Sequence, residues 1–444
     1  MARSYKTEVF ETLDMILPSR SADENYWWNL TGPQLAALVE GASYSPAKQY
    51  EALLFHYHWM IPYMGPAPWA PGSELQWKSL LQPDGSPIEY SWKWNTATGE
   101  PDIRYDIEPI NRFSGTQHDP LNQSASREML HRLEEKIPTV DLTWANHYFN
   151  TLYDHDSTKY HEEHKSGKKA FGTIVVAAEF LPKGIRFKTY YLPRKLGQGA
   201  TPDLKVFASS ARLVDPDNNA ISELEAFLST SDEGKLLKPF SVAIDNVVPE
   251  KSRLKWYFNS PHTNFKALRE IMTLGGRIHR PNLEKQLTEL QELLRGVLQL
   301  PEDYPEDQEL PNAGQNNRVA AGEDVNDTAP PLLPGFVYYF DVAPGNQLPE
   351  IKLALPLITF AQSDAGVARN TIAWMEARGR GAYAKNFMQM LEKLAKGKDL
   401  ARGKGLQSFI SVLLRENGEL DVTTYFAPQA LALVHEEVNA ANGQ

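Results

Sequence analysis

The sequence contains no cysteine and no long apolar run. Without cysteine among its 444 residues, the chain can form no disulfide, no cysteine-ligated zinc site and no thiol nucleophile. No apolar stretch approaches the roughly 20 residues that span a bilayer, and Met1–Lys6 is not followed by the apolar core of a signal peptide. We therefore expect a soluble, cytoplasmic protein with no membrane partner.

The sequence is also short of positive charge. Its 45 basic residues face 56 acidic residues, which gives a net charge of −11. Nucleic-acid-binding proteins carry the opposite excess, so we expect no nucleic-acid partner. Hydrophobic residues make up 42% of the chain and aromatic residues 11%, which suffices for a large core. Basic residues that gather in a few strands of such a chain are expected to be local and functional.

Two predicted strands carry such a gathering. In each strand, two basic residues and a tyrosine share one face, because strand side chains alternate: Arg186, Lys188 and Tyr190 in the first, and Arg253, Lys255 and Tyr257 in the second. Arg104 and Lys352 lie in similar strand patterns. The pattern predicts a positively charged, tyrosine-lined cavity that suits a multiply charged anion such as a diphosphate.

The opposite faces of these strands are apolar. Phe187, Leu254 and Trp256 suit packing against helices, which would direct the basic faces into an enclosed interior. Buried cations without compensation are very costly, so this arrangement predicts a bound anion or water. A solvent-exposed strand face is the alternative. For Glu89, which lies in an aromatic strand, the sequence leaves solvent and interior equally open.

The chain repeats a unit of two helices followed by a hairpin about five times. The expected helices lie at residues 23–39, 46–60, 126–137, 142–153, 204–213, 221–228, 264–273, 283–298, 367–378 and 383–396. The expected strands lie at residues 88–95, 103–107, 173–180, 185–192, 240–248, 253–258, 336–342, 350–355, 406–414 and 422–426. Ten antiparallel strands with helices on one side predict an α+β fold closed into a barrel, which buries the other face and removes the edges.

We expect one domain over residues 1–444, with the helices of residues 1–70 packed on the barrel. Residues 301–334, rich in proline, asparagine and acidic residues, are interpreted as a long loop; a linker between two domains is the alternative. Glu323–Asp327 resembles an acidic magnesium-binding motif, but it lies in this loop rather than on a helix. We therefore predict no metal site.

Ordered motifs along nearly the whole chain are similar to those of one family. They are Trp27-Trp28, Ile61–Pro66, Glu89, Glu108-Pro109, Phe113–Thr116 running to Asp119–Gln123, Lys188-x-Tyr190, Pro249–Tyr257, Thr273–Gly276 and Tyr425-Phe426. In these motifs the chain resembles the fungal dimethylallyl-tryptophan-synthase family of aromatic prenyltransferases. The resemblance implies a ten-stranded barrel of ααββ repeats, with the active site in its lumen.

The resemblance also implies a reaction. A dimethylallyl group would move from dimethylallyl diphosphate to a ring carbon of an indole, as in an indole alkaloid, an indole diterpene or a cyclic dipeptide, without a metal or other cofactor. Arg104, Lys188, Arg253, Lys255 and Lys352 would bind the diphosphate beside Tyr190, Tyr257 and Tyr425. Glu89 would be catalytic and accept the indole N–H, and Leu80, Leu81 and Thr116 would line the acceptor site. The enzyme would be a monomer or a homodimer.

The sequence departs from the family pattern at several positions. Ala354 and Phe409 stand where tyrosines are common, and Leu192 and Phe240 replace polar residues of members that take free tryptophan. We therefore expect tryptophan to be a poor substrate. If Gly335 holds the family's gate for prenyl length, a geranyl donor would fit. A phenolic, xanthone or polyketide acceptor and a non-catalytic ligand carrier stay open as alternatives.

Overall fold

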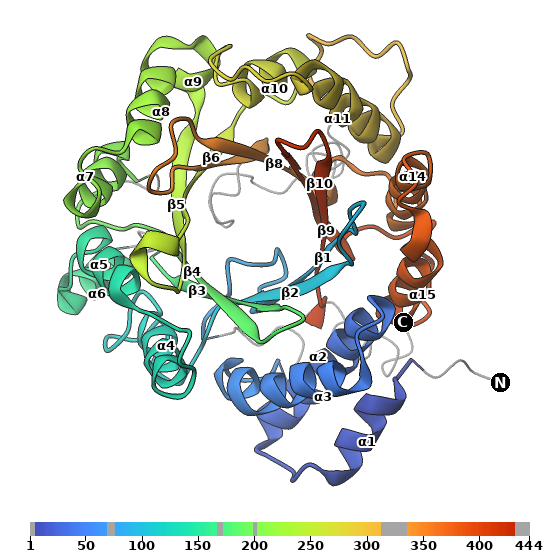
Figure 1. Cartoon of the computed structure of the whole chain (residues 1–444). Coiled ribbons are helices and arrows are strands. Elements are labelled where there is room, and N and C mark those ends of the chain that lie inside the picture. The colour runs from blue at the N-terminus through green and yellow to red at the C-terminus, as the bar shows by residue number, and fades with distance from the viewer. Residues whose placement is uncertain (1–4, 69–75, 167–171, 199–201, 312–334, 431–444) are drawn as a thin grey trace.

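Ten antiparallel strands form a closed barrel, and helices surround it (Figure 1). The computed structural model describes residues 5–68, 76–166, 172–198, 202–311 and 335–430. The strands are β1 (Ile88–Lys93), β2 (Asp102–Ile107), β3 (Ile174–Phe180), β4 (Ile185–Tyr191), β5 (Lys238–Asp245), β6 (Leu254–Ser260), β7 (Phe336–Asp341), β8 (Glu350–Pro356), β9 (Gln407–Leu414) and β10 (Leu420–Phe426). Each strand pairs with its neighbours in sequence, and β1 closes the ring on β10. The predicted ten-stranded α+β barrel is confirmed.

The helices form the outer ring in Figure 1. They are α1 (Glu8–Ile16), α2 (Ala22–Gly41), α3 (Pro46–Phe55), α4 (Ser124–Lys136), α5 (Thr143–Leu152), α6 (Ser157–Lys165), α7 (Leu204–Val214), α8 (Asn219–Thr230), α9 (Asp232–Leu236), α10 (Phe265–Met272), α11 (Leu283–Leu298), α13 (Leu357–Phe360), α14 (Asp364–Glu376) and α15 (Ala384–Ala395). Two main helices precede each hairpin, as predicted, whereas α1, α9 and α13 were not expected. None of these helices combines the length and apolarity that crossing a membrane requires.

Local signals set the ends of these elements. Ser21, Asn264 and Ser363 precede α2, α10 and α14, and each side chain accepts a backbone N–H of the first helical turn. Gly184 and Gly418 lie in the turns of the β3–β4 and β9–β10 hairpins with φ of 81° and 89°. A glycine adopts such positive φ values without steric cost, so these tight turns hold the hairpins in register.

Strand side chains alternate between the helical ring and the barrel lumen. On the outer face, the Trp92 ring packs 5.5 Å from that of Phe387 in α15, and Trp256 packs 5.9 Å from Phe207 in α7. The Tyr90 hydroxyl donates a hydrogen bond of 3.2 Å to a backbone oxygen of α2. Because these residues face the helices, the residues between them face the lumen.

The segment before β7 joins two strands of the same barrel, since β6 and β7 are paired neighbours. Its described part, residues 301–311, contains turns and no helix or strand. The remainder, residues 312–334, lies outside the described residues, and so does the acidic motif Glu323–Asp327.

Candidate active site

A cavity of about 110 Å³ lies inside the barrel. It is lined by Ser91, Lys93, Asp102, Arg104, Glu179, Lys188, Tyr190, Arg253, Lys255, Tyr257, Val337, Tyr339, Lys352, Ala354, Ser411, Leu413, Arg415, Asp421, Thr423 and Tyr425. All eight residues expected to surround the diphosphate are among them, although they come from β2, β4, β8, β10, and β6 with the residue that precedes it, Arg253. The structure therefore brings together in one enclosed space residues that are up to 321 positions apart, as between Arg104 and Tyr425.

The two basic strand faces meet in this cavity. Lys188 and Lys255 are buried, with 4% and 5% of their surface exposed, and the rings of Tyr190 and Tyr257 lie 5.9 Å apart. Arg186 shares their face but lies near the end of β4, where 44% of its side chain is exposed. The prediction that the basic faces point inward is thus confirmed.

The expectation that these buried cations lack compensation is wrong. Glu179 lies 3.0 Å from Lys188, and Asp245 lies 2.6 Å from Arg253 and 3.6 Å from Lys255. The acidic residues come from β3 and β5, whose side chains lie beside the basic ones across the sheet. One strand read alone does not reveal such neighbours, so the charge balance could not be seen in the sequence.

The cavity nevertheless keeps an excess of positive charge. Seven basic and three acidic side chains line it, and the buried carboxylates of Asp106, Asp245 and Asp341 act on the same cations, so the excess is small. Burial lowers the pKa of Lys188 to about 7, against the opposing effect of Glu179, and the charges of Arg104 and Lys255 lower it further. Lys352 has no ion-pair partner in the described part of the chain and reaches only the Thr423 hydroxyl, at 3.4 Å. A multiply charged anion would relieve this mutual repulsion.

Tyrosine rings cover one side of the basic cluster. The Tyr257 ring lies 5.3 Å from that of Tyr339, and Arg104 both lies 5.5 Å from the Tyr425 ring and donates to its hydroxyl at 3.1 Å. The Phe409 ring packs 6.4 Å from Tyr425. Tyr339 was not predicted, although its alternation with Val337 in β7 places both on one face and could have revealed it.

Glu89 faces the lumen, which settles the question that the sequence left open. It belongs to the same face of β1 as Ser91 and is 8% exposed. Its Oε1 accepts hydrogen bonds from Gln82 Nε2 at 2.9 Å and Ser408 Oγ at 2.7 Å. Burial, and then the charge of Asp106, raise the pKa of Glu89 to about 8. The carboxyl can therefore exchange a proton near neutral pH.

The segment before β1 is held to Glu89 and Glu108 by hydrogen bonds. The backbone N–H of Leu80 donates to Glu108 at 2.9 Å, and that of Leu81 donates to the Ser79 hydroxyl at 3.1 Å. The same Glu108 carboxylate is fully buried and accepts hydrogen bonds from Trp77, Ser79, Leu80 and Asn122. This network fixes Leu80 and Leu81 next to Gln82, which holds Glu89.

Two expectations from the resemblance fit the structure less well. Thr116 lies in the turn after Phe113, where its hydroxyl donates to the Phe113 carbonyl at 2.7 Å; like Leu80, Leu81 and Glu89, it is not among the described residues that line the lumen cavity. A Cβ at Gly335 would lie 1.8 Å from the Ser260 carbonyl oxygen. Gly335 therefore permits two backbone segments to approach closely and does not open the lumen.

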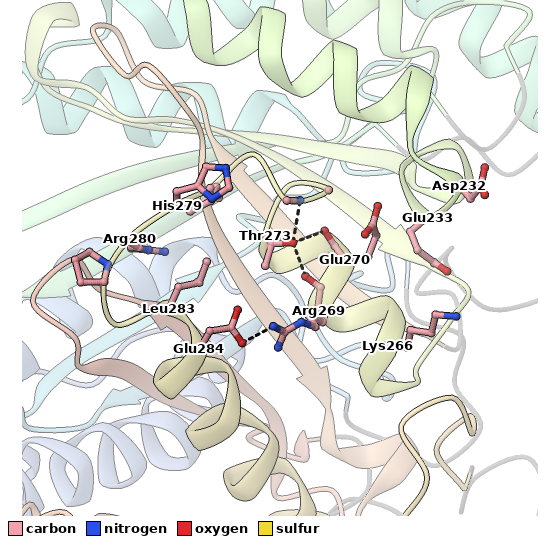
Figure 2. Close-up of a pocket in the computed structure, with 14 residues that line it drawn as sticks. Asp232, Glu233, Lys266, Arg269, Glu270, Thr273, His279, Arg280, Leu283 and Glu284 are labelled. Carbon is pink, nitrogen blue, oxygen red and sulfur yellow. Dashed lines mark hydrogen bonds and ion pairs between the residues drawn. The ribbon is translucent and has the colours of Figure 1, made fainter.

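A larger hollow, of about 1110 Å³, lies outside the barrel between α9, α10 and the start of α11 (Figure 2). Its acidic and basic side chains compensate one another, as in the ion pair between Arg269 and Glu284. The Thr273 hydroxyl is occupied by backbone groups, including the N–H of Gly276 at 3.2 Å. Unlike the lumen, this hollow gathers no charge of one sign. Across the described residues, no group of three or more histidine, aspartate or glutamate side chains could hold a metal ion.

One known family matches most of the chain. The family model described as tryptophan dimethylallyltransferase matches residues 23–390. This chain belongs to the tryptophan dimethylallyltransferase family. As a member, it is an aromatic prenyltransferase, an enzyme, and the alternative of a non-catalytic carrier no longer stands.

Other members of the family are similar over almost their full length. The prenyltransferase anuH of Penicillium roqueforti (strain FM164) is 50% identical over 426 residues, which cover 96% of this chain and 93% of the relative. Xanthone prenyltransferase B of Emericella nidulans is 46% identical over 442 residues, which cover 98% of this chain and 95% of the relative.

Solved structures of other prenyltransferases share the fold. AnaPT from Neosartorya fischeri superimposes with a TM-score of 0.77 at 23% identity, covering 95% of this chain and 97% of AnaPT. NotF in complex with brevianamide F and DMSPP superimposes with a TM-score of 0.75 at 20% identity, covering 94% of this chain and 98% of NotF. The barrel is therefore shared with solved structures that are only distantly similar in sequence.

Proposed function

We propose that the enzyme transfers a dimethylallyl group from dimethylallyl diphosphate to a ring carbon of a hydroxylated aromatic acceptor of the xanthone type. The observation that carries this proposal is the convergence of three kinds of group in one lumen. Basic side chains and tyrosine rings line its cavity, and the buried carboxyl of Glu89 lies opposite Asp106, which pairs with Arg104.

The basic cluster is proposed to bind the diphosphate. Arg104, Lys188, Arg253, Lys255 and Lys352 all line the cavity. As the bond between the allyl carbon and the diphosphate oxygen breaks, negative charge grows on the diphosphate. Cations already fixed around that position stabilise this charge without having to reorient. These side chains would supply the stabilisation that a metal ion gives in other enzymes, so we propose metal-independent transfer.

The tyrosines are proposed to protect the allyl cation. The faces of Tyr190, Tyr257, Tyr339 and Tyr425 border the same cavity as the basic groups. The face of an aromatic ring attracts a cation by roughly 0.5–2 kcal/mol. The rings also exclude water, which would otherwise capture the cation before the acceptor does.

Glu89 is proposed to accept the acceptor's proton. A phenolic hydroxyl has a pKa near 10, which lies close to the pKa of about 8 of the Glu89 carboxyl. An indole N–H is far less acidic, so the match favours a phenol. Relatives named as xanthone prenyltransferases, 46% and 44% identical to this chain, support the same acceptor class. An indole, favoured by the family resemblance alone, is the alternative.

The apolar side chains near the acceptor argue against free tryptophan. Phe240 packs 6.0 Å from the Tyr257 ring, and Leu192 lies half-buried just after β4. Neither can pair with the carboxylate or ammonium group of an amino acid. We therefore keep the expectation that tryptophan is a poor substrate.

The donor could be longer than five carbons. Val337, Ala354 and Ser411 are direct cross-strand partners on β7, β8 and β9, and all three line the cavity. This row of small side chains interrupts the ring of tyrosines. It leaves more room than a tyrosine at position 354 would, which supports geranyl diphosphate as a second donor.

One experiment tests the function. The purified enzyme is incubated with dimethylallyl or geranyl diphosphate and a hydroxyxanthone, tryptophan or a tryptophan-containing cyclic dipeptide, with and without EDTA, and products are identified by mass spectrometry. We expect the hydroxyxanthone to gain C5H8 from dimethylallyl diphosphate, or C10H16 from geranyl diphosphate, equally with and without EDTA. Turnover of indoles alone would refute the acceptor class, and loss of activity in EDTA would refute metal independence.

A further inference from the structure

Asp106 is a lumen carboxyl to which the reaction described above assigns no role. It lies on β2 directly opposite Glu89 on β1. Its neighbours Tyr105 and Ile107 point outward, and Tyr105 packs against the His56 ring of the helical ring at 5.3 Å. Because side chains alternate along β2, Asp106 shares the inner face with Arg104, which lines the cavity.

The Asp106 carboxylate is buried and incompletely partnered. Only 6% of the residue is exposed. Its buried Oδ1 has no hydrogen-bond donor among the described residues, and Arg104 Nε lies 3.6 Å away. An ionised carboxylate can accept several hydrogen bonds, and buried polar groups are seldom left without them. A donor from a bound molecule would satisfy this atom.

We propose that Asp106 and Glu89 form a carboxyl pair that binds two hydroxyls of one acceptor ring and takes up the proton released by the transfer. Directly opposed strand residues place their Cβ atoms about 4.5–5.5 Å apart. Two hydroxyls in a 1,3 relation on an aromatic ring have a similar spacing. The pair therefore selects a 1,3-dihydroxylated ring, whose carbons ortho to hydroxyl are strongly nucleophilic. This inference rests on the proposed function.

The surroundings give the two carboxyls different protonation states. Burial raises the pKa of Asp106, and the charges of Arg104 and Lys188 oppose this effect. Glu89 lacks such close cations, and the charge of Asp106 helps to raise its pKa. The nearby cations thus favour the ionised form of Asp106, and the charge of Asp106 favours the protonated form of Glu89. The charged groups that act on Asp106 come from β2, β3, β4 and β6: Arg104, Glu179, Lys188 and Lys255.

The proposed step is balanced. The bond from the allyl carbon to the diphosphate oxygen breaks, and its electron pair leaves with the diphosphate. A ring carbon next to a hydroxyl forms the new bond to the allyl carbon. The hydrogen on that ring carbon is then lost as a proton, which the Asp106–Glu89 pair accepts and later releases to solvent.

A simpler role is that Asp106 only balances the charge of Arg104. The two roles differ in which substrate they affect. A partner of Arg104 would change the binding of the donor, whereas a partner of the acceptor would change the binding and conversion of the acceptor. Asp245 provides a matched comparison, because it is also a buried lumen carboxylate but pairs with Arg253 and Lys255.

The test compares wild type, Asp106→Asn and Asp245→Asn on a 1,3-dihydroxyxanthone and its two mono-methyl ethers. For wild type we expect kcat/KM to fall at least tenfold when either hydroxyl is methylated. Asp106→Asn should lose on the order of a hundredfold in kcat/KM for the dihydroxy acceptor and no longer distinguish it from one ether. Its donor KM and its affinity for pyrophosphate should stay within about twofold of wild type. Asp245→Asn should alter the donor KM and keep the discrimination between acceptors.

The possible results distinguish failure of the proposed carboxyl pair from failure of the proposed function. If wild type converts indoles but no hydroxyxanthone, the proposed function fails, and the inference fails with it. If wild type converts the xanthone and both ethers equally well, only the carboxyl pair is refuted; this comparison needs no variant and holds even if Asp106→Asn does not fold. An Asp106→Asn enzyme that changes only in donor KM would assign Asp106 to Arg104 alone. The pH profile of kcat/KM is the independent check. Its acid limb should move to lower pH in Asp106→Asn, because the charge of Asp106 no longer raises the pKa of Glu89.

Discussion

The two oxygens of the Glu89 side chain have different surroundings. Oε1 accepts hydrogen bonds from Gln82 and Ser408, and no hydrogen bond to Oε2 is found within the described residues. One oxygen therefore holds the group in place, while the other can receive a substrate proton. Burial without a close cation makes this carboxyl a stronger base than an ordinary glutamate.

Replacing Glu89 by glutamine should reduce turnover on the order of 10²–10³-fold, because the variant cannot accept a proton. In wild type, kcat/KM for the acceptor should rise as the pH increases through about 8, where the carboxyl ionises. The pH profile of the Glu89→Gln enzyme should lack this rise. An unchanged profile would remove Glu89 from the reaction.

Glu89→Gln should raise the stability of the fold at high pH, although it lowers turnover. The folded pKa of about 8 lies above the reference value of 4.5, so this group contributes stability that is complete below 4.5 and is lost as the pH rises through 8. Glu89→Gln should therefore unfold at a higher temperature than wild type at pH 9, with a smaller difference at pH 6. Thermal unfolding at both values measures this change. A variant less stable at pH 9 would contradict it.

Variants of Lys188 and Glu179 distinguish donor binding from the stability of the fold. Lys188→Met leaves the Glu179 carboxylate, which is 13% exposed, without its nearest cation. We expect a loss of about 3 kcal/mol in the free energy of unfolding and a rise in donor KM of at least tenfold. Adding Glu179→Gln should restore most of the stability but not the donor affinity. Urea unfolding and steady-state kinetics test this, and recovery of both properties would mean that Lys188 does not contact the donor.

The site could be predicted from sequence only where one strand carries the signal. Lys188 and Tyr190, or Lys255 and Tyr257, are two positions apart, so their shared face is visible in the sequence. Glu179, Asp245, Asp106 and Tyr339 become neighbours of these groups only through the pairing of different strands. For that reason the inward orientation of the basic groups could be predicted, and the carboxylates that compensate them were missed.

At the scale of elements, one tyrosine joins a helical connection to the barrel. Tyr44, between α2 and α3, donates to the Phe180 carbonyl at 2.6 Å and accepts from the Ile103 N–H at 2.9 Å. Ile103 and Phe180 are cross-strand partners of β2 and β3. The hydroxyl is thus inserted between two strand ends that would otherwise bond each other.

Tyr44→Phe should leave a buried donor and a buried acceptor unpaired and cost about 1–3 kcal/mol of stability. Hydrogen exchange at the Ile103 amide should accelerate, since its hydrogen bond is lost. Tyr50→Phe is the control, because its hydroxyl makes no hydrogen bond to any other described residue. Equal exchange rates in both variants would show that the strand ends close on each other without Tyr44.

The elements themselves were predicted where their periodicity was strong. The hairpins alternate between apolar and polar residues around recognisable turns, and the paired helices carry apolar stripes. Helices α9 and α13 have only five and four residues. Such short segments offer no apolar stripe to detect.

At the scale of the whole molecule, the chain is acidic, whereas basic side chains gather around the lumen cavity. The chain carries a net charge of −11, yet its lumen gathers seven basic side chains. An anion that enters the lumen binds the closed barrel, whereas the unfolded chain has no such cluster. Ligands that bind only the folded state stabilise it in proportion to the logarithm of their concentration.

Pyrophosphate alone should therefore raise the melting temperature. At a concentration of 100 times its dissociation constant, the gain should be about 2.7 kcal/mol in the free energy of unfolding. We expect the same shift with EDTA present, because the basic side chains make the contacts. Scanning calorimetry over a pyrophosphate series measures the effect. A shift that requires magnesium would point to a metal–pyrophosphate complex as the ligand.

The barrel cannot close during synthesis until β10 has been translated, because β1 pairs with β10. Strand β1 is translated early, and its partner ends at residue 426. At about 5–20 residues per second, the ribosome needs on the order of tens of seconds between the two strands. Throughout that interval the nascent sheet has two unpaired edges, which are prone to aggregate. Chaperone supply during translation should thus govern the yield of active protein.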